Sequence, residues 1–112
     1  MSRDAVYLEH VLNAIARIEQ YSAVGQERFL TEPHWHDAVI RQLEIIGEAT
    51  KRLPMDLREQ YPDIPWKGMA GMRDRIIHGY DNVDYQIVWD VVKDDIPQIR
   101  PQLQQILLEY ED

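Results

Sequence analysis

The sequence contains no cysteine, a single phenylalanine, five glycines and no long apolar run. The absence of cysteine excludes disulfide bonds and thiolate zinc sites. No apolar run approaches the roughly 20 residues that a membrane-spanning helix needs. The first residues turn acidic at Asp4 and lack the basic-then-apolar pattern of a secretion signal. We therefore expect a cytoplasmic protein that does not bind membranes.

Acidic residues dominate the charge. The 112 residues include 12 Lys/Arg and 20 Asp/Glu, for a formal charge of −8, and 45% are hydrophobic. This length and composition predict one folded domain over residues 1–112. The overall acidity argues against broad electrostatic binding of DNA or anionic membranes. However, residues 66–78 carry +2 while the rest of the chain carries −10, so this stretch is the first place to look for a site.

Apolar residues recur at steps of three or four, the period of an amphipathic helix. A first helix is expected from the N-cap Ser2 to Gly25, followed by a loop over 26–33. A second helix is expected to begin between Thr31, a candidate cap, and His34, with Pro33 in its first turn, and to stop at Leu53, ahead of Pro54. Residues 55–61 then have room for one or two short turns.

The second half of the chain predicts two more helices. One runs from Pro65 or Trp66 through Ile77, and Gly79 ends it. Its glycines, Gly68 and Gly71, weaken the helix but let another backbone come close. The last helix starts after Asp84 and runs to Leu107, with a kink or break expected at Pro97 and Pro101. The pattern indicates an all-α fold, a small antiparallel bundle of four to five helices.

Histidines and glutamates offer candidate sites outside residues 66–78. His34 and His36 have the residue type of metal ligands. Residues two apart on a helix point in different directions, however, so the two imidazoles would not bind one metal ion. A packed or solvated helix start is therefore favoured. His10 is expected to be structural. Glu44 and Glu48 lie four apart on one helix face and could bind a divalent ion or do acid/base work. The alternative is that they orient a basic group, with Glu48 partly buried against an arginine.

The sharpest cluster is Arg73-Asp74-Arg75-Ile76-Ile77-His78-Gly79-Tyr80. The planar guanidinium of Arg73 suits phosphate oxygens, and His78 can move protons near neutral pH. On a helix Asp74 would reach the imidazole of His78 and fix its tautomer. Tyr80 adds a hydroxyl. Such groups suit metal-free cleavage of RNA, whose 2′-OH supplies the nucleophile. The alternative is that an arginine and a histidine near a helix end are ordinary surface residues.

Arg73 and His78 are five residues apart, about 140° around one helix, so a single chain does not place them on one face. A second copy of the same segment would make a compact cluster. The spacing therefore favours a symmetric homodimer with this segment at the two-fold axis.

At this segment the sequence resembles the HepT-like toxins of the HEPN superfamily. Their signature is an arginine, a polar residue, three residues, a histidine, any residue and a tyrosine, and it is met by Arg73, Asp74, His78 and Tyr80. Asp74 stands where many relatives have asparagine. The resemblance extends to the opening Arg3-Asp4 helix and to AVIRQLEIIGEATKRL, PDIPWKGMAGMRDRIIHGY and VDYQIVWDVVKDDIP.

This resemblance implies a homodimeric, HEPN-like helical bundle that acts as a metal-independent endoribonuclease toxin without a cofactor. Arg73 and His78 would be catalytic, Asp74 and Tyr80 supporting, and Lys67 and Arg75 RNA contacts. It also implies a MntA-like nucleotidyltransferase antitoxin that transfers AMP to Tyr80. The phosphate of that AMP would add charge and bulk where RNA should bind.

Two other functions remain open from the residues. One is a helical module that binds a nucleotide or a basic partner without catalysis. The other is metal-dependent hydrolysis through Glu44 and Glu48, which chelation would abolish.

Overall fold

The computed structural model describes residues 2–77 and 82–111. Within them the chain is helical and contains no strand, while an isolated antiparallel bridge joins Ile77 to Val83. The elements in chain order are α1 (Arg3–Ser22), α2 (Gln26–Thr31), α3 (Pro33–Lys51), α4 (Met55–Gln60), α5 (Trp66–Ala70), α6 (Met72–Ile76), α7 (Tyr85–Asp90), the π-helix η1 (Val91–Asp95) and α8 (Ile96–Glu111). The expected all-α bundle is confirmed.

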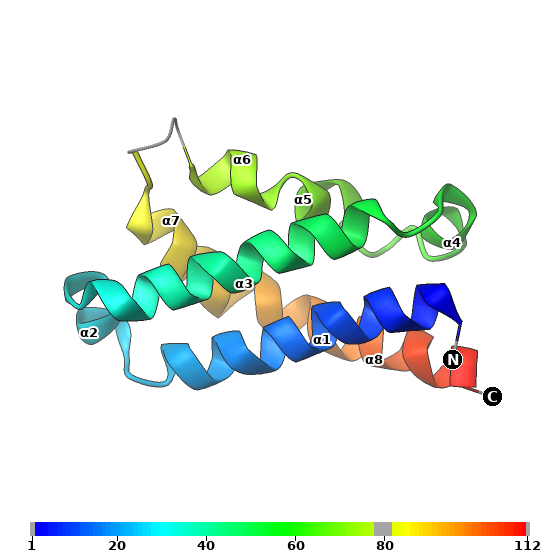
Figure 1. The fold of residues 1–112 in the computed structure, drawn as a ribbon, viewed down its shortest axis with the longest axis horizontal. Helices are drawn as coiled ribbons and strands as arrows, with labels where there is room; N and C mark the ends of the chain where they lie inside the picture. Colours follow the sequence, from blue (N-terminus) through cyan, green and yellow to red (C-terminus); the bar gives the residue numbers. More distant parts are fainter. Residues whose placement is uncertain (1, 78–81, 112) are drawn as a thin grey trace.

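Three long helices form the frame of the bundle. α1 and α3 lie antiparallel, and α8 returns along α1 so that the two ends of the chain are close together (Figure 1). The α5–α6 segment runs alongside α3, on the side away from α1 (Figure 1). Their apolar stripes meet in one core, whose largest fully buried side chains include Leu8, Ile15, Phe29, Leu43, Ile46, Ile76, Ile96 and Leu103.

Local signals position the start of α1 as expected. The backbone N–H of Ala5 donates to Oγ of Ser2 at 3.1 Å, which satisfies one of the unpaired donors at the helix start. The helix ends at Ser22, and Gly25 follows with a φ of +94°, a backbone conformation that glycine adopts without strain.

The loop expected over 26–33 is wrong, because residues 26–31 form α2. Phe29 is fully buried, and tertiary packing of this ring can hold a helix too short to be stable alone. Glu32, rather than Thr31, is the N-cap of α3, and Pro33 is the first helical residue as expected. Glu32 accepts hydrogen bonds from Arg28 and from Nε1 of Trp35, which lowers the pKa of Glu32 to about 2.

The single helix expected over residues 66–77 is also wrong in detail, because Gly71 separates α5 from α6. Glycine favours this break through its poor helix propensity. A Cβ on Gly68 would meet nothing within 4 Å, so the expected close backbone approach is wrong for Gly68. A Cβ on Gly71 would lie 3.3 Å from the carbonyl oxygen of Lys67 in the same segment. The close approach between helices is at Gly47 on α3, where a Cβ would lie 3.4 Å from the carbonyl oxygen of Ala70.

The last helix begins at its expected cap, since Ile87 N–H donates to Oδ1 of Asp84 at 3.1 Å. The prolines do not break it. The π-helical turn of η1 precedes Pro97, where an α-helix would clash with the carbonyl four residues earlier. α8 then continues through Pro101. In the part of the chain that the structure describes, no helix is long and apolar enough to cross a membrane.

The close approach of α3 and α5 at Gly47 yields a stability prediction. Gly47→Ala should leave the protein as stable or up to ~1 kcal/mol more stable, since the new methyl makes ordinary contact and alanine favours a helix. Gly47→Leu should lower the free energy of unfolding by ~1–3 kcal/mol through overpacking. Urea unfolding measures both. Gly68→Leu is the control, because its Cβ faces open space, and equal destabilisation by both leucines would contradict the close approach.

Candidate functional site

α6 holds the candidate arginines on a very short helix. Met72 and Ile76 are buried and fix α6 to the core, whereas Arg73, Asp74 and Arg75 are exposed. The two arginines contact different neighbours, Arg73 on the α3 side and Arg75 on the η1 side. α6 therefore presents two chemically separate faces.

Arg73 is positioned by Glu44 of α3. Its Nε lies 3.5 Å from Oε2 of Glu44, and the arginine side chain is 62% exposed against 33% for the glutamate. The shortest contact of this pair runs through Nε, so the terminal Nη groups, the end of the fork that can bind a phosphate, lie farther from the carboxylate. The arrangement can hold a cation in place while presenting it to an incoming anion.

Glu44 and Glu48 thus differ from the expectation in one respect. An acidic residue of this pair does orient an arginine, but it is Glu44. The Glu48 side chain is 66% exposed and lies 3.5 Å from Nζ of Lys51, so the expected partial burial of Glu48 is wrong. Each carboxylate has a cationic neighbour, which weakens the reading of the pair as a divalent-metal site.

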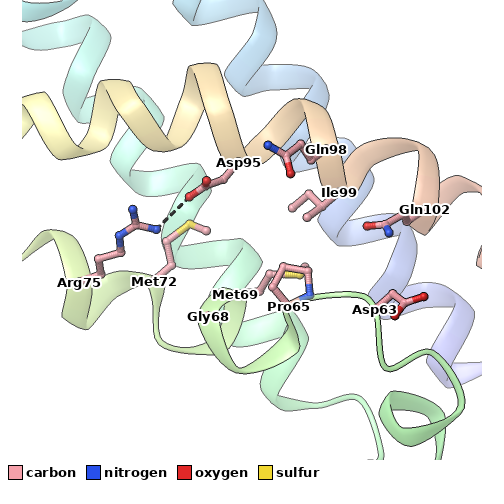
Figure 2. A pocket seen from close by; sticks show the side chains of 10 residues that line it. All are labelled: Asp63, Pro65, Gly68, Met69, Met72, Arg75, Asp95, Gln98, Ile99 and Gln102. Atoms are coloured by element: carbon pink, nitrogen blue, oxygen red, sulfur yellow. Dashed lines mark hydrogen bonds and ion pairs between the residues drawn. The ribbon is translucent and has the colours of Figure 1, made fainter.

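Arg75 lines a groove between α5–α6 and the η1–α8 segment. Figure 2 shows its guanidinium turned to Asp95, with Nη1 to Oδ2 at 2.8 Å. The groove encloses about 700 Å³ above Met69, Met72 and Ile99. Asp63 and Asp95 outnumber the single arginine among its charged lining residues, so this groove is poorly suited to a phosphate. Lys67, the other predicted RNA contact, is exposed on α5 and is not among the residues lining the groove.

His78, Gly79 and Tyr80 lie outside the described residues. α6 ends at Ile76, and Ile77 has an extended backbone. The helical register on which the expected Asp74–His78 contact rested therefore ends before residue 78, and that contact stays a prediction. The residues that flank this segment contact each other: Ile77 forms a β-bridge with Val83, and the backbone N–H of Asp84 donates to the carbonyl of Ile76.

The remaining histidines occupy unlike surroundings. His36 is buried between Phe29 and Tyr85, with ring centroids 6.1 and 3.9 Å away, whereas the His34 side chain is 65% exposed. The helix start is therefore packed at His36 and solvated at His34. Within residues 2–77 and 82–111, no three His, Asp or Glu side chains are grouped to hold a metal ion.

A second polar cavity, between α1 and α3, escaped the sequence reasoning. It is lined by Tyr7, His10, Arg41, Glu44, Ile45, Glu48, Ala49 and Arg52. The six lining positions between 41 and 52, on α3 and its C-cap Arg52, recur at helical spacing, a stripe that the sequence could have revealed. The facing Tyr7 and His10 come from α1, so only the packing of the two helices brings them there. His10, expected to be structural, is exposed.

Comparison with known proteins gives the family. The model of the family described as "Ribonuclease HepT-like" matches residues 11–106. A "Probable ribonuclease HepT" of Thermococcus cleftensis is 44% identical over 101 residues, covering 89% of this chain and 92% of that protein. A "Putative RNase" of Caldanaerobacter subterraneus is 43% identical over 102 residues, covering 90% and 91%.

A longer relative also matches. The "Gamma-glutamylcyclotransferase and putative RNase" of Methanocaldococcus jannaschii is 46% identical over 107 residues, which are 95% of this chain but 48% of that protein. The chain thus spans about half of this relative and about nine-tenths of the other two. No solved structure matches significantly. The family match and these identities show that the chain belongs to the HepT-like ribonuclease family.

Proposed function

We propose that the protein is an endoribonuclease toxin that cleaves RNA without a metal ion. The observation that supports this most is Arg73, an exposed guanidinium held at Nε by Glu44 and lying within the segment that the family model matches. Arg73 binds and neutralises the scissile phosphate. His78 transfers protons, Asp74 orients His78, and Tyr80 lines the site.

The chemistry requires few groups because RNA contains its own nucleophile. The 2′-oxygen attacks the neighbouring phosphorus while a base removes its proton. The 5′-oxygen then leaves with a proton from an acid, so the products are a 2′,3′-cyclic phosphate and a 5′-hydroxyl. Arg73 stabilises the extra charge on the phosphorane. DNA lacks the 2′-hydroxyl and is spared.

A homodimer supplies the second proton-transfer group. Two copies of His78 at a two-fold axis allow one imidazole to act as base and the other as acid. Lys67 and Arg75 are secondary RNA contacts, and Arg75 must first leave Asp95, an exposed pair that contributes little stability. The proposed partner is a MntA-like nucleotidyltransferase antitoxin.

Removal of either catalytic group is expected to abolish cleavage. His78→Ala and Arg73→Ala should each lower kcat/KM for RNA by at least ~100-fold, the lower range for a lost acid–base group. Cleavage of a labelled RNA, followed by gel in the presence of EDTA, measures this.

The wild-type products should carry cyclic phosphate ends, and both variants should keep the wild-type oligomeric state by light scattering. Undiminished cleavage by His78→Ala would refute the catalytic role. Saturable nucleotide binding without cleavage by the wild type would favour the non-catalytic module, and activity that EDTA destroys would favour metal-dependent hydrolysis.

Glu44 is proposed as a positioning residue, and Glu48 provides its matched control one turn away on α3. Glu44→Gln should lower kcat by about 10- to 100-fold, the scale of a misplaced reacting group. KM should not rise, because the substitution removes a negative charge near the RNA. Glu48→Gln should leave kcat unchanged, because Glu48 lies against Lys51 and not against Arg73.

The double variant distinguishes positioning from general structural damage. In an Arg73→Lys background the additional Glu44→Gln change should have little effect, because the geometry that Glu44 fixes is already lost. Fully additive losses would contradict a role exerted through Arg73.

Tyr80 is the proposed site of neutralisation by the antitoxin. Co-expression with a MntA-like nucleotidyltransferase should add the mass of one adenylyl group to the intact protein, and RNA cleavage should cease, because the new phosphate repels the substrate. Intact-mass spectrometry checks this. Tyr80→Phe should acquire no added mass, and an unchanged adenylyl adduct on that variant would place the modification elsewhere.

A further inference from the structure

The cavity between α1 and α3 encloses about 340 Å³. This lies within the range of small-ligand sites, which combine an apolar base with a few converging polar groups. Here Ile45 and Ala49 supply the apolar surface, and charged or aromatic side chains surround it.

The charges around this cavity favour an anion. Its two carboxylates each have a cationic neighbour, Glu44 with Arg73 and Glu48 with Lys51. In the described part of the chain, no carboxylate forms an ion pair with Arg41 or Arg52. Among the residues that line the cavity, Arg41 and Arg52 balance Glu44 and Glu48, and each carboxylate has a further cationic neighbour outside the lining. On a chain with a charge of −8, such a cluster of exposed cations is a feature that nucleic-acid backbones recognise.

The aromatic groups of the cavity suit a nucleobase. The Arg52 guanidinium lies 6.0 Å from the centre of the Tyr7 ring, and the Tyr7 and His10 rings meet edge to face at 6.2 Å. Proteins that bind single-stranded RNA stack bases on such rings and on arginine planes, and bind the phosphates with neighbouring cations.

The cavity also shares one residue with the proposed catalytic arginine. Glu44 lines it and at the same time holds Arg73. We propose that this cavity binds a nucleotide of single-stranded RNA next to the scissile linkage, with Tyr7 stacking on the base and Arg41 and Arg52 binding flanking phosphates. This inference rests on the proposed ribonuclease function. The larger groove beside Arg75 fits less well, because two carboxylates outnumber its one arginine.

Binding is tested in a His78→Ala background so that the probe stays intact. Fluorescence anisotropy with a short single-stranded RNA should show that Arg41→Ala and Arg52→Ala each weaken binding about 10-fold. Each should also reduce the slope of log affinity against log salt by ~0.7, the loss of one phosphate contact on a single strand. Arg100→Ala is the matched control, because Arg100 pairs with Glu19 outside the cavity. It should change neither the affinity nor the slope.

Tyr7 tests the stacking contact. Tyr7→Leu should weaken binding about fivefold or more, the lower range for a lost base stack, whereas Tyr7→Phe should retain it. An equal loss for both would overturn the stacking role.

Two outcomes separate this inference from the proposed function. If the wild type cleaves RNA but the arginine variants bind the probe with unchanged affinity and salt slope, the inference fails and the ribonuclease stands. If the arginine variants turn dimers into monomers by light scattering, this face is an interface between copies of the chain, and the RNA site is overturned. Absence of cleavage by the wild type refutes the proposed function instead.

Discussion

Burial of two side chains holds α6, the helix on which the candidate site depends. Five residues cannot sustain a helix in water by hydrogen bonding alone, so α6 exists because Met72 and Ile76 are inserted into the core formed with α3 and its neighbours. Once those two are buried, the intervening arginines must face outward. The Arg73–Glu44 and Arg75–Asp95 pairs then tie α6 to α3 on one side and to η1 on the other.

The two sides of α6 have different electrostatic character. On the Arg75 side, the arginine is closed against Asp95 above a methionine-lined floor. On the Arg73 side, the pair with Glu44 uses Nε and continues into a surface with further arginines and aromatic rings. A phosphate chain would therefore be attracted to the α1–α3 side. This asymmetry places the proposed catalytic arginine and the proposed nucleotide site on the same side of α6.

Sequence reasoning worked best where a local pattern determines the structure. The Ser2 and Asp84 caps, Pro33 at the start of α3 and the stop before Pro54 depend on neighbouring atoms, and all are present as expected. It failed at α2, where burial of Phe29 makes a helix of an expected loop. It also failed in detail at Gly71, which divides an expected helix, and before Pro97, where η1 relieves the clash of the proline ring, because apolar periodicity does not show how the backbone accommodates these residues.

The sequence by itself determined the helical class, the family and the motif from Arg73 to Tyr80, because periodicity, caps and motif spacing are properties of neighbouring residues. Only the tertiary structure decided that Glu44, and not Glu48, reaches Arg73, and that Tyr7 meets Arg52. Those pairs join residues 29 and 45 positions apart in the chain, and their contact follows from how α3 packs against α6 and α1, which no local pattern specifies.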